Sequence, residues 1–365
     1  MLVSYNAEMI FGTPMIGSDL RHRLDELDGL RQALGSDAER MTPWIGALRR
    51  AVRASSIESS TSIEGYSVEP AEAIALTSGT APGDGADENR LAVACYARAM
   101  DHVGAMARDP GFGWSERVIL DLHFDACHFQ RDKSPGLWRT GPISVTGPDG
   151  GVDYRGPDGG DVPGLMAEVV RALEDAADVH PIVRAAMAHL NVTSVHPFRD
   201  GNGRVARIVQ SLVLAREGLL SPEFSSIEEY LADNTPAYYA ALRDTQGGSY
   251  RPNRDASEWV RFCVEAHIAQ AGRRLDQIHK AAMRWERLER EVDARGWPDR
   301  FTTALERSLV GGLDRAGYGA EVEVSPATVT ADLRRLLDSG LVEQRGRGPG
   351  TRYWASDRLG ELLAG

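Results

Sequence analysis

The sequence predicts a mainly α fold, because apolar residues recur at helical spacing along most of the chain and alternate over only a few short stretches. Glycine- and proline-rich segments separate the helical ones, as at 78–86. The alternating stretch 143–146 predicts a strand, and the glycine-rich segment 147–161 that follows it is expected to be a mobile loop. Helices are expected over 18–34, where Gly35 ends the first, from Pro43 onward, and over 71–76, 87–108, 115–130, 162–178, 181–194, 226–231, 235–242 and 257–291.

Composition and charge describe an ordinary soluble globular protein. The chain has 365 residues, of which 42% are hydrophobic and 26% charged. Its formal net charge of −12 argues against bulk electrostatic binding to nucleic acid or to an anionic membrane. Cys95, Cys127 and Cys263 are too scattered for a disulfide framework or a metal cage, which favours reduced thiols in a cytoplasmic protein. No basic-then-apolar leader and no long apolar run occurs, so neither secretion nor membrane spanning is expected.

One run of twelve residues carries most of the functional information: His-Pro-Phe-Arg-Asp-Gly-Asn-Gly-Arg-Val-Ala-Arg at 196–207. Its Gly-Asn-Gly turn leads into a stretch with apolar residues at 205, 208, 209 and 212, the spacing of an amphipathic helix. A glycine-rich turn that opens a helix presents free backbone N–H groups and the positive end of the helix dipole. Such a turn favours phosphate binding.

Four side chains of this run suit phosphate chemistry. Arg204 and Arg207, three residues apart on a helix, can reach one polyphosphate. Asp200 can hold Mg²⁺ against phosphate oxygens, and His196 can take a proton near neutral pH. A lone Gly-x-Gly or a lone histidine is usually only a turn or a packing residue. The combination predicts a phosphate site with a general base.

The run matches every fixed position of HPFx(D/E)GNGRxxR, and the chain therefore resembles Fic-domain proteins of the Fic/Doc superfamily. The resemblance implies a helical bundle and Mg²⁺-dependent transfer of AMP from ATP to a hydroxyl of a target protein. It makes His196 the general base and Asp200 the metal ligand. It places the anion hole at Gly201, Asn202 and Gly203. It implies that Arg204 contacts the phosphates and that Arg207 binds the γ phosphate. Doc kinases carry lysine at the place of Gly203, so glycine favours nucleotidyl transfer over phosphorylation.

An upstream segment, Ser60-x-x-x-Glu64-Gly65, allows two interpretations. It can be a helix end that Gly65 terminates. It also resembles the Fic inhibitory motif (S/T)xxxE(G/N). That resemblance implies that Glu64 pairs with Arg207 and places negative charge where the γ phosphate belongs.

Two further segments resemble functional parts of Fic proteins. The strands at 143–146 and 152–155 resemble the Fic β-hairpin flap, which aligns the target by strand addition, although an ordinary surface loop stays an alternative. Tyr238 and Tyr239 resemble the nucleotide-side helix of the family. We expect one of them to face the core and the other to stack on adenine.

The C-terminal part resembles a winged helix-turn-helix domain. A helix at 301–309, a short strand at 322–324, a helix at 325–339 and a two-stranded wing are expected. Five arginines could meet DNA: Arg334, Arg335, Arg345, Arg347 and Arg352. From Arg300 onward, however, nine arginines balance nine acidic residues, so contact with a partner protein or a dimer mate is an equal alternative.

These segments divide the chain into four parts: an N-terminal helical region with the inhibitory motif (1–110), a Fic catalytic core (111–250), a helical connector (251–297) and a winged-helix-like domain (298–365). The leading hypothesis is a protein adenylyltransferase that Glu64 autoinhibits. Its partner is a protein with a Ser, Thr or Tyr hydroxyl, with self-modification and homodimerisation as further expectations. Removal of AMP, transfer of UMP or GMP, and a nucleotide-sensing DNA-binding regulator are the alternatives.

Overall fold

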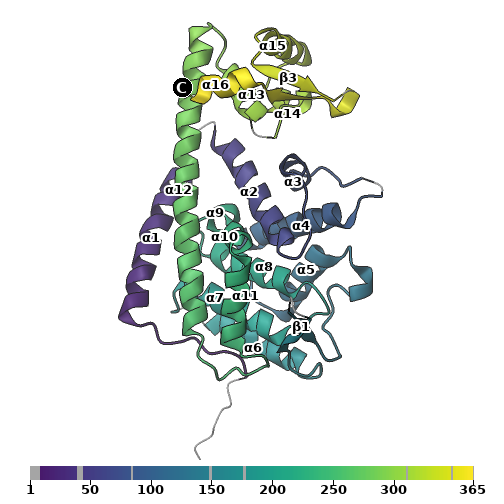
Figure 1. Cartoon of the computed structure of the whole chain (residues 1–365), viewed down its shortest axis with the longest axis vertical. Helices are drawn as coiled ribbons and strands as arrows, with labels where there is room; N and C mark the ends of the chain where they lie inside the picture. The colour runs from purple at the N-terminus through teal and green to yellow at the C-terminus, as the bar shows by residue number, and fades with distance from the viewer. Residues whose placement is uncertain are drawn as a thin grey trace, which may run out of the picture.

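The computed structural model describes residues 9–38, 44–83, 85–147, 150–175, 178–309, 311–346 and 348–364. The described chain is mainly helical, as the sequence predicts. The long helix α12 (Ser257–Ala294) runs along the molecule, with α1 (Ser18–Ala38) beside it and the C-terminal elements at one end (Figure 1). The body contains α2 (Ile45–Ser62), α3 (Pro70–Thr77), α4 (Glu88–Arg108), α5 (Glu116–Cys127), α6 (Val162–Asp175), α7 (Pro181–Val195), α8 (Asn202–Arg216), α9 (Pro222–Ser225), α10 (Glu228–Asp233) and α11 (Thr235–Gln246).

Helices α7 and α8 form the centre of the body. Nearly every residue of both is buried, so other helices cover them on all sides. On one side, the Trp259 indole of α12 donates a hydrogen bond of 2.7 Å to the carbonyl of Ala186 in α7. Because two buried helices flank it, the loop 196–201 between them has fixed ends.

Local capping explains several predicted boundaries. The Asp87 side chain accepts a hydrogen bond from the Arg90 N–H at the start of α4, and Ser115 does the same for Val118 at the start of α5. Pro181 occupies the first turn of α7, where its missing N–H removes no helical hydrogen bond.

Gly35 does not end the first helix, which continues to Ala38. A Cβ atom at Gly35 would lie 3.3 Å from the carbonyl oxygen of Leu219. The glycine therefore permits close packing against the chain after α8, and the prediction of a helix terminator was wrong.

The predicted hairpin is present as β1 (Ser144–Thr146) and β2 (Val152–Arg155), which pair antiparallel with a register shift at Val145/Thr146. The Tyr154 hydroxyl donates a hydrogen bond of 2.6 Å to the carbonyl of Ser194, near the end of α7. The hairpin is thus fastened to the central helix.

The C-terminal elements have a hydrophobic core of their own, to which α12 contributes Leu288 and Val292. They are α13 (Arg300–Leu309), α14 (Arg315–Glu321), α15 (Pro326–Asp338) and α16 (Asp357–Ala364), with the antiparallel strands β3 (Val342–Arg345) and β4 (Arg352–Ala355).

The predicted strand at 322–324 is absent from this described region. The N–H groups of Val322 and Val324 bond back to Tyr318 and Gly319, so these residues close the end of α14. Leu313, which precedes α14, instead pairs with Tyr353 of β4 through two backbone hydrogen bonds of 2.8 Å. None of the helices in the described ranges is both long and apolar enough to cross a membrane.

Leu288→Ala should lower the free energy of unfolding by about 2–5 kcal/mol, because Leu288 is fully buried in the C-terminal core although it belongs to α12. Met283→Ala is the matched control on the same helix, since Met283 is 56% exposed. It should change stability by less than about 0.5 kcal/mol. Chemical denaturation of both variants measures the difference, and equal effects would contradict the shared core.

Candidate active site

A cavity of about 780 Å³ opens between the hairpin, the loop after α7 and the helix α11. The loop contributes His196 and the segment from Arg199 to Gly203, and α11 contributes Tyr238 and Tyr239. Glu64, from the end of the α2 segment, also lines this cavity. The cavity is therefore lined by residues that lie more than a hundred positions apart in the sequence.

His196 ends α7 in a left-handed conformation, with φ of 51°. Its Nδ1 lies 3.1 Å from the carbonyl oxygen of Thr193, which can only accept, so Nδ1 carries the proton. The Nε2 lone pair is then left to act as a base. Burial lowers the pKa of His196, and the nearby Arg139 charge lowers it further. The hydrogen bond to Thr193 raises this pKa, but by less than burial lowers it. The imidazole is thus neutral at pH 7.

Arg139 holds the end of α7 in this shape. Its Nε donates to the carbonyl of His196 at 2.7 Å, and Nη2 reaches the carbonyl of Val195 at 3.2 Å. The same guanidinium also donates to the carbonyls of Gly141 at 2.6 Å and Pro157 at 2.7 Å, which flank the hairpin. Arg139 is 3% exposed. Arg139 lies in no recognised motif, so its place in the site could not be predicted from the sequence.

The side chain of Asn202 stabilises the Gly-Asn-Gly turn to which it belongs. The Asn202 amide accepts a hydrogen bond from the Phe198 N–H and donates one to the Phe198 carbonyl, both at 2.9 Å. Gly201 has a φ of 77°, and a Cβ there would lie 2.4 Å from the Cys127 sulfur. Glycine is therefore required at this position for two reasons.

His123 supports the turn from α5, as a packing residue. Its ring stacks on Phe198 with centroids 3.6 Å apart. Its Nδ1 accepts from the Gly136 N–H at 2.8 Å, so Nε2 carries the proton and donates to the Asp200 carbonyl at 3.0 Å. Burial lowers its pKa to about 4, which keeps the ring neutral.

The Asp200 carboxylate lies at the mouth of the turn. Its Oδ1 accepts from the Gly201 N–H at 2.6 Å and from Arg204 at 3.3 Å, and its Oδ2 accepts from Gln130 at 2.8 Å. Its side chain is 37% exposed toward the cavity.

This donor set fits magnesium held together with a nucleotide. No group of three or more His, Cys, Asp or Glu side chains that could hold a metal occurs in the described part of the chain. Mg²⁺ typically takes one or two carboxylates and completes its coordination with phosphate oxygens and water. A single exposed carboxylate beside a glycine turn at a helix N-terminus is compatible with that mode.

Arg207 is buried, and its partners come from α2. Its Nε donates to the Ser60 hydroxyl at 2.7 Å, and its Nη2 donates to the Ser60 carbonyl at 3.0 Å and to the Glu64 carboxylate at 2.9 Å. Burial is the largest single effect and lowers the pKa of Arg207, but the Glu64 carboxylate together with the nearby Tyr238 and Tyr96 hydroxyls outweighs it, so this pKa is raised. Gly65, with φ of 88°, ends this segment.

Glu64 also lies against the first turn of α8. A Cβ atom at Gly203 would be 2.6 Å from Glu64 Oε1 and 3.2 Å from Arg207 Nη1. The Glu64 carboxylate therefore occupies the positive end of the helix, where an anion is favoured.

The two arginines lie behind the cavity wall rather than in it. Arg204 is 1% exposed, and its guanidinium lies beside the rings of Tyr66 and Phe129, at 5.5 and 5.6 Å from their centroids. Nε and Nη1 of Arg204 and Nη1 of Arg207 have no hydrogen-bond partner among the described residues.

Of the two tyrosines, Tyr238 faces the core. It is 1% exposed, and its hydroxyl lies 2.9 Å from Nε2 of His189. Tyr239 is 42% exposed, with its ring 5.1 Å from that of Tyr238. Only Tyr239 presents its ring broadly to the cavity side.

The site thus combines a neutral imidazole, a carboxylate, a glycine turn at a helix N-terminus and two buried guanidiniums. Comparison with known proteins gives this arrangement a class: residues 113–214 match the Fic/DOC family. The chain carries a Fic/DOC family domain.

Particular relatives extend the likeness. The chain is 30% identical over 253 residues to the protein adenylyltransferase Fic of Drosophila melanogaster. This alignment covers 67% of this chain and 46% of that protein. It is 39% identical over 79 residues to the protein adenylyltransferase fic-1 of Caenorhabditis elegans, covering 22% and 14%. The chain therefore spans less than half of these relatives.

Solved structures share the fold. A Fic family protein from Desulfovibrio desulfuricans has a TM-score of 0.61 at 21% identity, covering 95% of this chain and 98% of that one. Fic-1 of C. elegans (134–508) has a TM-score of 0.56 at 22% identity, covering 70% and 71%.

Gly201→Ala should destabilise the protein by about 1–3 kcal/mol through overpacking against Cys127, in addition to about 1–2 kcal/mol for the left-handed backbone. Adding Cys127→Ala removes the sulfur, so the double variant should be more stable than the sum of the single effects predicts. Thermal or chemical unfolding of the four proteins tests this cycle. Strict additivity would show that the close approach does not exist.

Proposed function

We propose that this chain is a protein adenylyltransferase that transfers AMP from ATP to a hydroxyl side chain of a target protein, and that Glu64 holds it inactive. One observation carries the proposal: the Glu64 carboxylate lies 2.9 Å from Arg207 and against Gly203. This is the N-terminus of α8, the kind of place that favours phosphate. The names of the Drosophila and C. elegans relatives support the same activity.

The chemistry follows from the positions of the side chains. His196 Nε2 takes the proton from the incoming hydroxyl, whose oxygen attacks the α phosphorus of ATP. The bond from that phosphorus to the bridging oxygen breaks, and pyrophosphate leaves. The N–H groups of the turn 201–203 would bind the phosphate oxygens, and Nη1 of Arg207, which has no partner among the described residues, would join them once Glu64 moves away. Mg²⁺ held by Asp200 would neutralise charge on the phosphates.

The nucleotide and the target would enter from different walls of the cavity. Tyr239 presents its ring for stacking on adenine, with Tyr238 behind it. The strand β1 lines the opposite side and can pair with an extended target segment. The target, self-modification and any dimer remain parts of this proposal.

Glu64 also favours a second reaction at the same site. Its side chain is 21% exposed and lines the cavity, so it can orient a water molecule and support removal of AMP from a modified protein. Transfer of UMP or GMP is a further alternative, and the mass added to the product distinguishes the groups.

The regulator alternative receives less support from the C-terminal arginines. Arg335 lies over the rings of Trp297 and Phe301, and Arg345 over that of Trp354. Arg352 donates to backbone carbonyls near 311. Arg347 lies outside the described residues. The nine arginines from Arg300 onward are balanced by nine acidic residues, and protein contact is therefore the better proposal for this winged-helix-like domain.

Glu64→Gly should increase labelling of the protein by α-³²P-ATP with Mg²⁺ by at least tenfold, because it removes the anion that competes with phosphate at α8. Adding His196→Ala should abolish the labelling, since the base is lost. Glu223→Gly is a matched control on α9 that should leave labelling low. A folded Glu64→Gly protein that transfers nothing, with any nucleotide or any candidate target, argues against the function.

The acid limb of kcat/KM for Glu64→Gly should have its midpoint below the usual histidine pKa of about 6.5. The base acts only when neutral, so activity rises as pH rises through the lowered pKa of His196 and is level at pH 7. Loss of Glu64 lowers that pKa further, because its negative charge raises it. Initial rates between pH 5 and 8 measure the profile, and a midpoint above 7 contradicts the assignment.

A further inference from the structure

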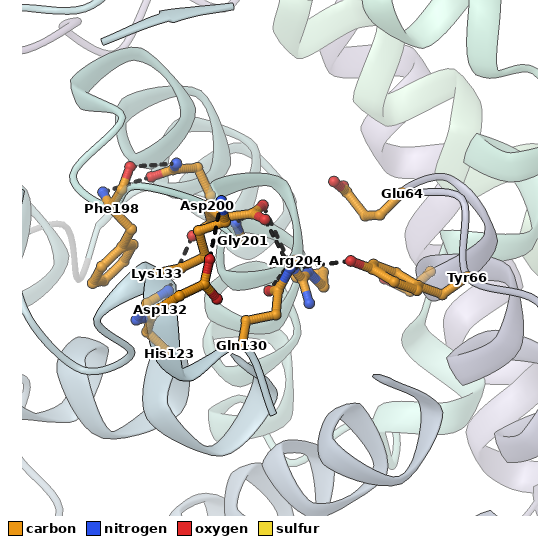
Figure 2. A network of polar contacts seen from close by, with 12 residues as sticks. Glu64, Tyr66, His123, Gln130, Asp132, Lys133, Phe198, Asp200, Gly201 and Arg204 are labelled. Atoms are coloured by element: carbon orange, nitrogen blue, oxygen red, sulfur yellow. Dashed lines mark hydrogen bonds and ion pairs between the residues drawn. The ribbon is translucent and has the colours of Figure 1, made fainter. Parts of the chain in front are cut away.

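Gln130 joins three groups that belong to different parts of the site. It lies just beyond the end of α5, and its Nε2 donates to Asp200 Oδ2 at 2.8 Å and to the Tyr66 hydroxyl at 3.0 Å. Its Oε1 accepts from Arg204 Nη2 at 2.8 Å. Figure 2 shows Gln130 between the Asp200–Arg204 pair and Tyr66.

The orientation of this amide is determined by its neighbours. A carboxylate only accepts and a guanidinium only donates, so the nitrogen must face Asp200 and the oxygen must face Arg204. We propose that Gln130 is a positioning residue that keeps the Asp200 carboxylate available to a divalent cation by holding it apart from Arg204. This inference rests on the proposed function, in which Asp200 binds Mg²⁺.

Arg204 is the group from which Asp200 must be kept apart. It is 1% exposed, and two of its nitrogens have no partner among the described residues. A buried cation needs an anion or an oriented acceptor. The Gln130 oxygen supplies that acceptor, and the direct contact between Arg204 and Asp200 stays long, at 3.3 Å. Without Gln130, the guanidinium would take Asp200 as a two-point partner and cover its oxygens.

The hydrogen bonds that remain leave room for a cation. An ionised carboxylate offers about four lone-pair positions. Gly201 and Arg204 use Oδ1, and Gln130 uses one position on Oδ2. The side chain is 37% exposed on the cavity side, where the phosphates would lie. Partners that orient a ligand in this way typically change metal affinity by 10–100-fold.

Tyr66 provides a matched comparison. Its hydroxyl shares the Gln130 nitrogen, whereas its ring packs against Phe129 and under Arg204. Tyr66→Phe removes one hydrogen bond from Gln130 and keeps this packing. Gln130→Met has similar length but loses the donor and the acceptor together.

The test measures how much Mg²⁺ tightens ATP binding, in full-length protein that cannot consume ATP (Glu64→Gly with His196→Ala). Equilibrium dialysis with labelled ATP, in Mg²⁺ and in EDTA, gives the ratio of the two dissociation constants. Gln130→Met should reduce this ratio by tenfold or more and leave the EDTA value within about threefold. Tyr66→Phe should keep the ratio of the parent, and Asp200→Ala should abolish it.

A parent-like ratio in folded Gln130→Met would overturn the inference, as would an equal loss in Tyr66→Phe. If Gln130→Met does not fold, Gln130→Asn replaces it in the test, because Asn keeps the amide but is one methylene too short. It should reduce the ratio of the two dissociation constants by the same tenfold or more. Failure of the proposed function looks different. In that case Glu64→Gly with His196 intact transfers no AMP, or the parent shows no Mg²⁺ effect at all, which removes both proposals.

Discussion

The contact between Arg207 and the α2 segment determines how the site is arranged. A fully buried guanidinium on the central helix α8 requires acceptors, and Ser60 and Glu64 supply them. The same contact fixes α2 against α8 and brings the Glu64 carboxylate to Gly203. The contact that packs α2 against α8 is therefore also the contact that places this carboxylate at the start of α8. A nucleotide phosphate would replace one anion with another at a helix N-terminus that favours either.

The position of His196 depends on a second constraint, the shape of the chain after α7. A left-handed residue at a helix end is unusual for histidine, and Arg139 stabilises it through the carbonyls of Val195 and His196. Arg139 and Tyr154 also fasten the hairpin to the same helix end. The base and the strand proposed to align the target thus share one support, so their separation is set by few bonds.

Helix α2 is held from its other side as well. Arg274, fully buried on α12, donates to the Ser56 hydroxyl of α2 at 3.1 Å and pairs with Glu229 of α10 at 2.9 Å. Because α12 also contributes to the C-terminal core, one continuous helix contacts both α2 and the C-terminal elements (Figure 1).

The sequence by itself determined the features that depend on local spacing. Capping residues and apolar periodicity predicted most helices, and the alternating stretch 143–146 predicted the first strand of the hairpin. The second strand was reached through family resemblance, and the phosphate turn with a base at 196–207 stays a prediction. The pairing of Glu64 with Arg207, 143 residues apart, was reached only through family resemblance. Only the tertiary structure decided that Gly35 allows close packing, that 322–324 ends a helix and that Tyr238 rather than Tyr239 is buried. It alone brought Gln130 and Arg139 to the site. These outcomes depend on which faces of distant elements meet, and neither periodicity nor spacing along the chain contains that information.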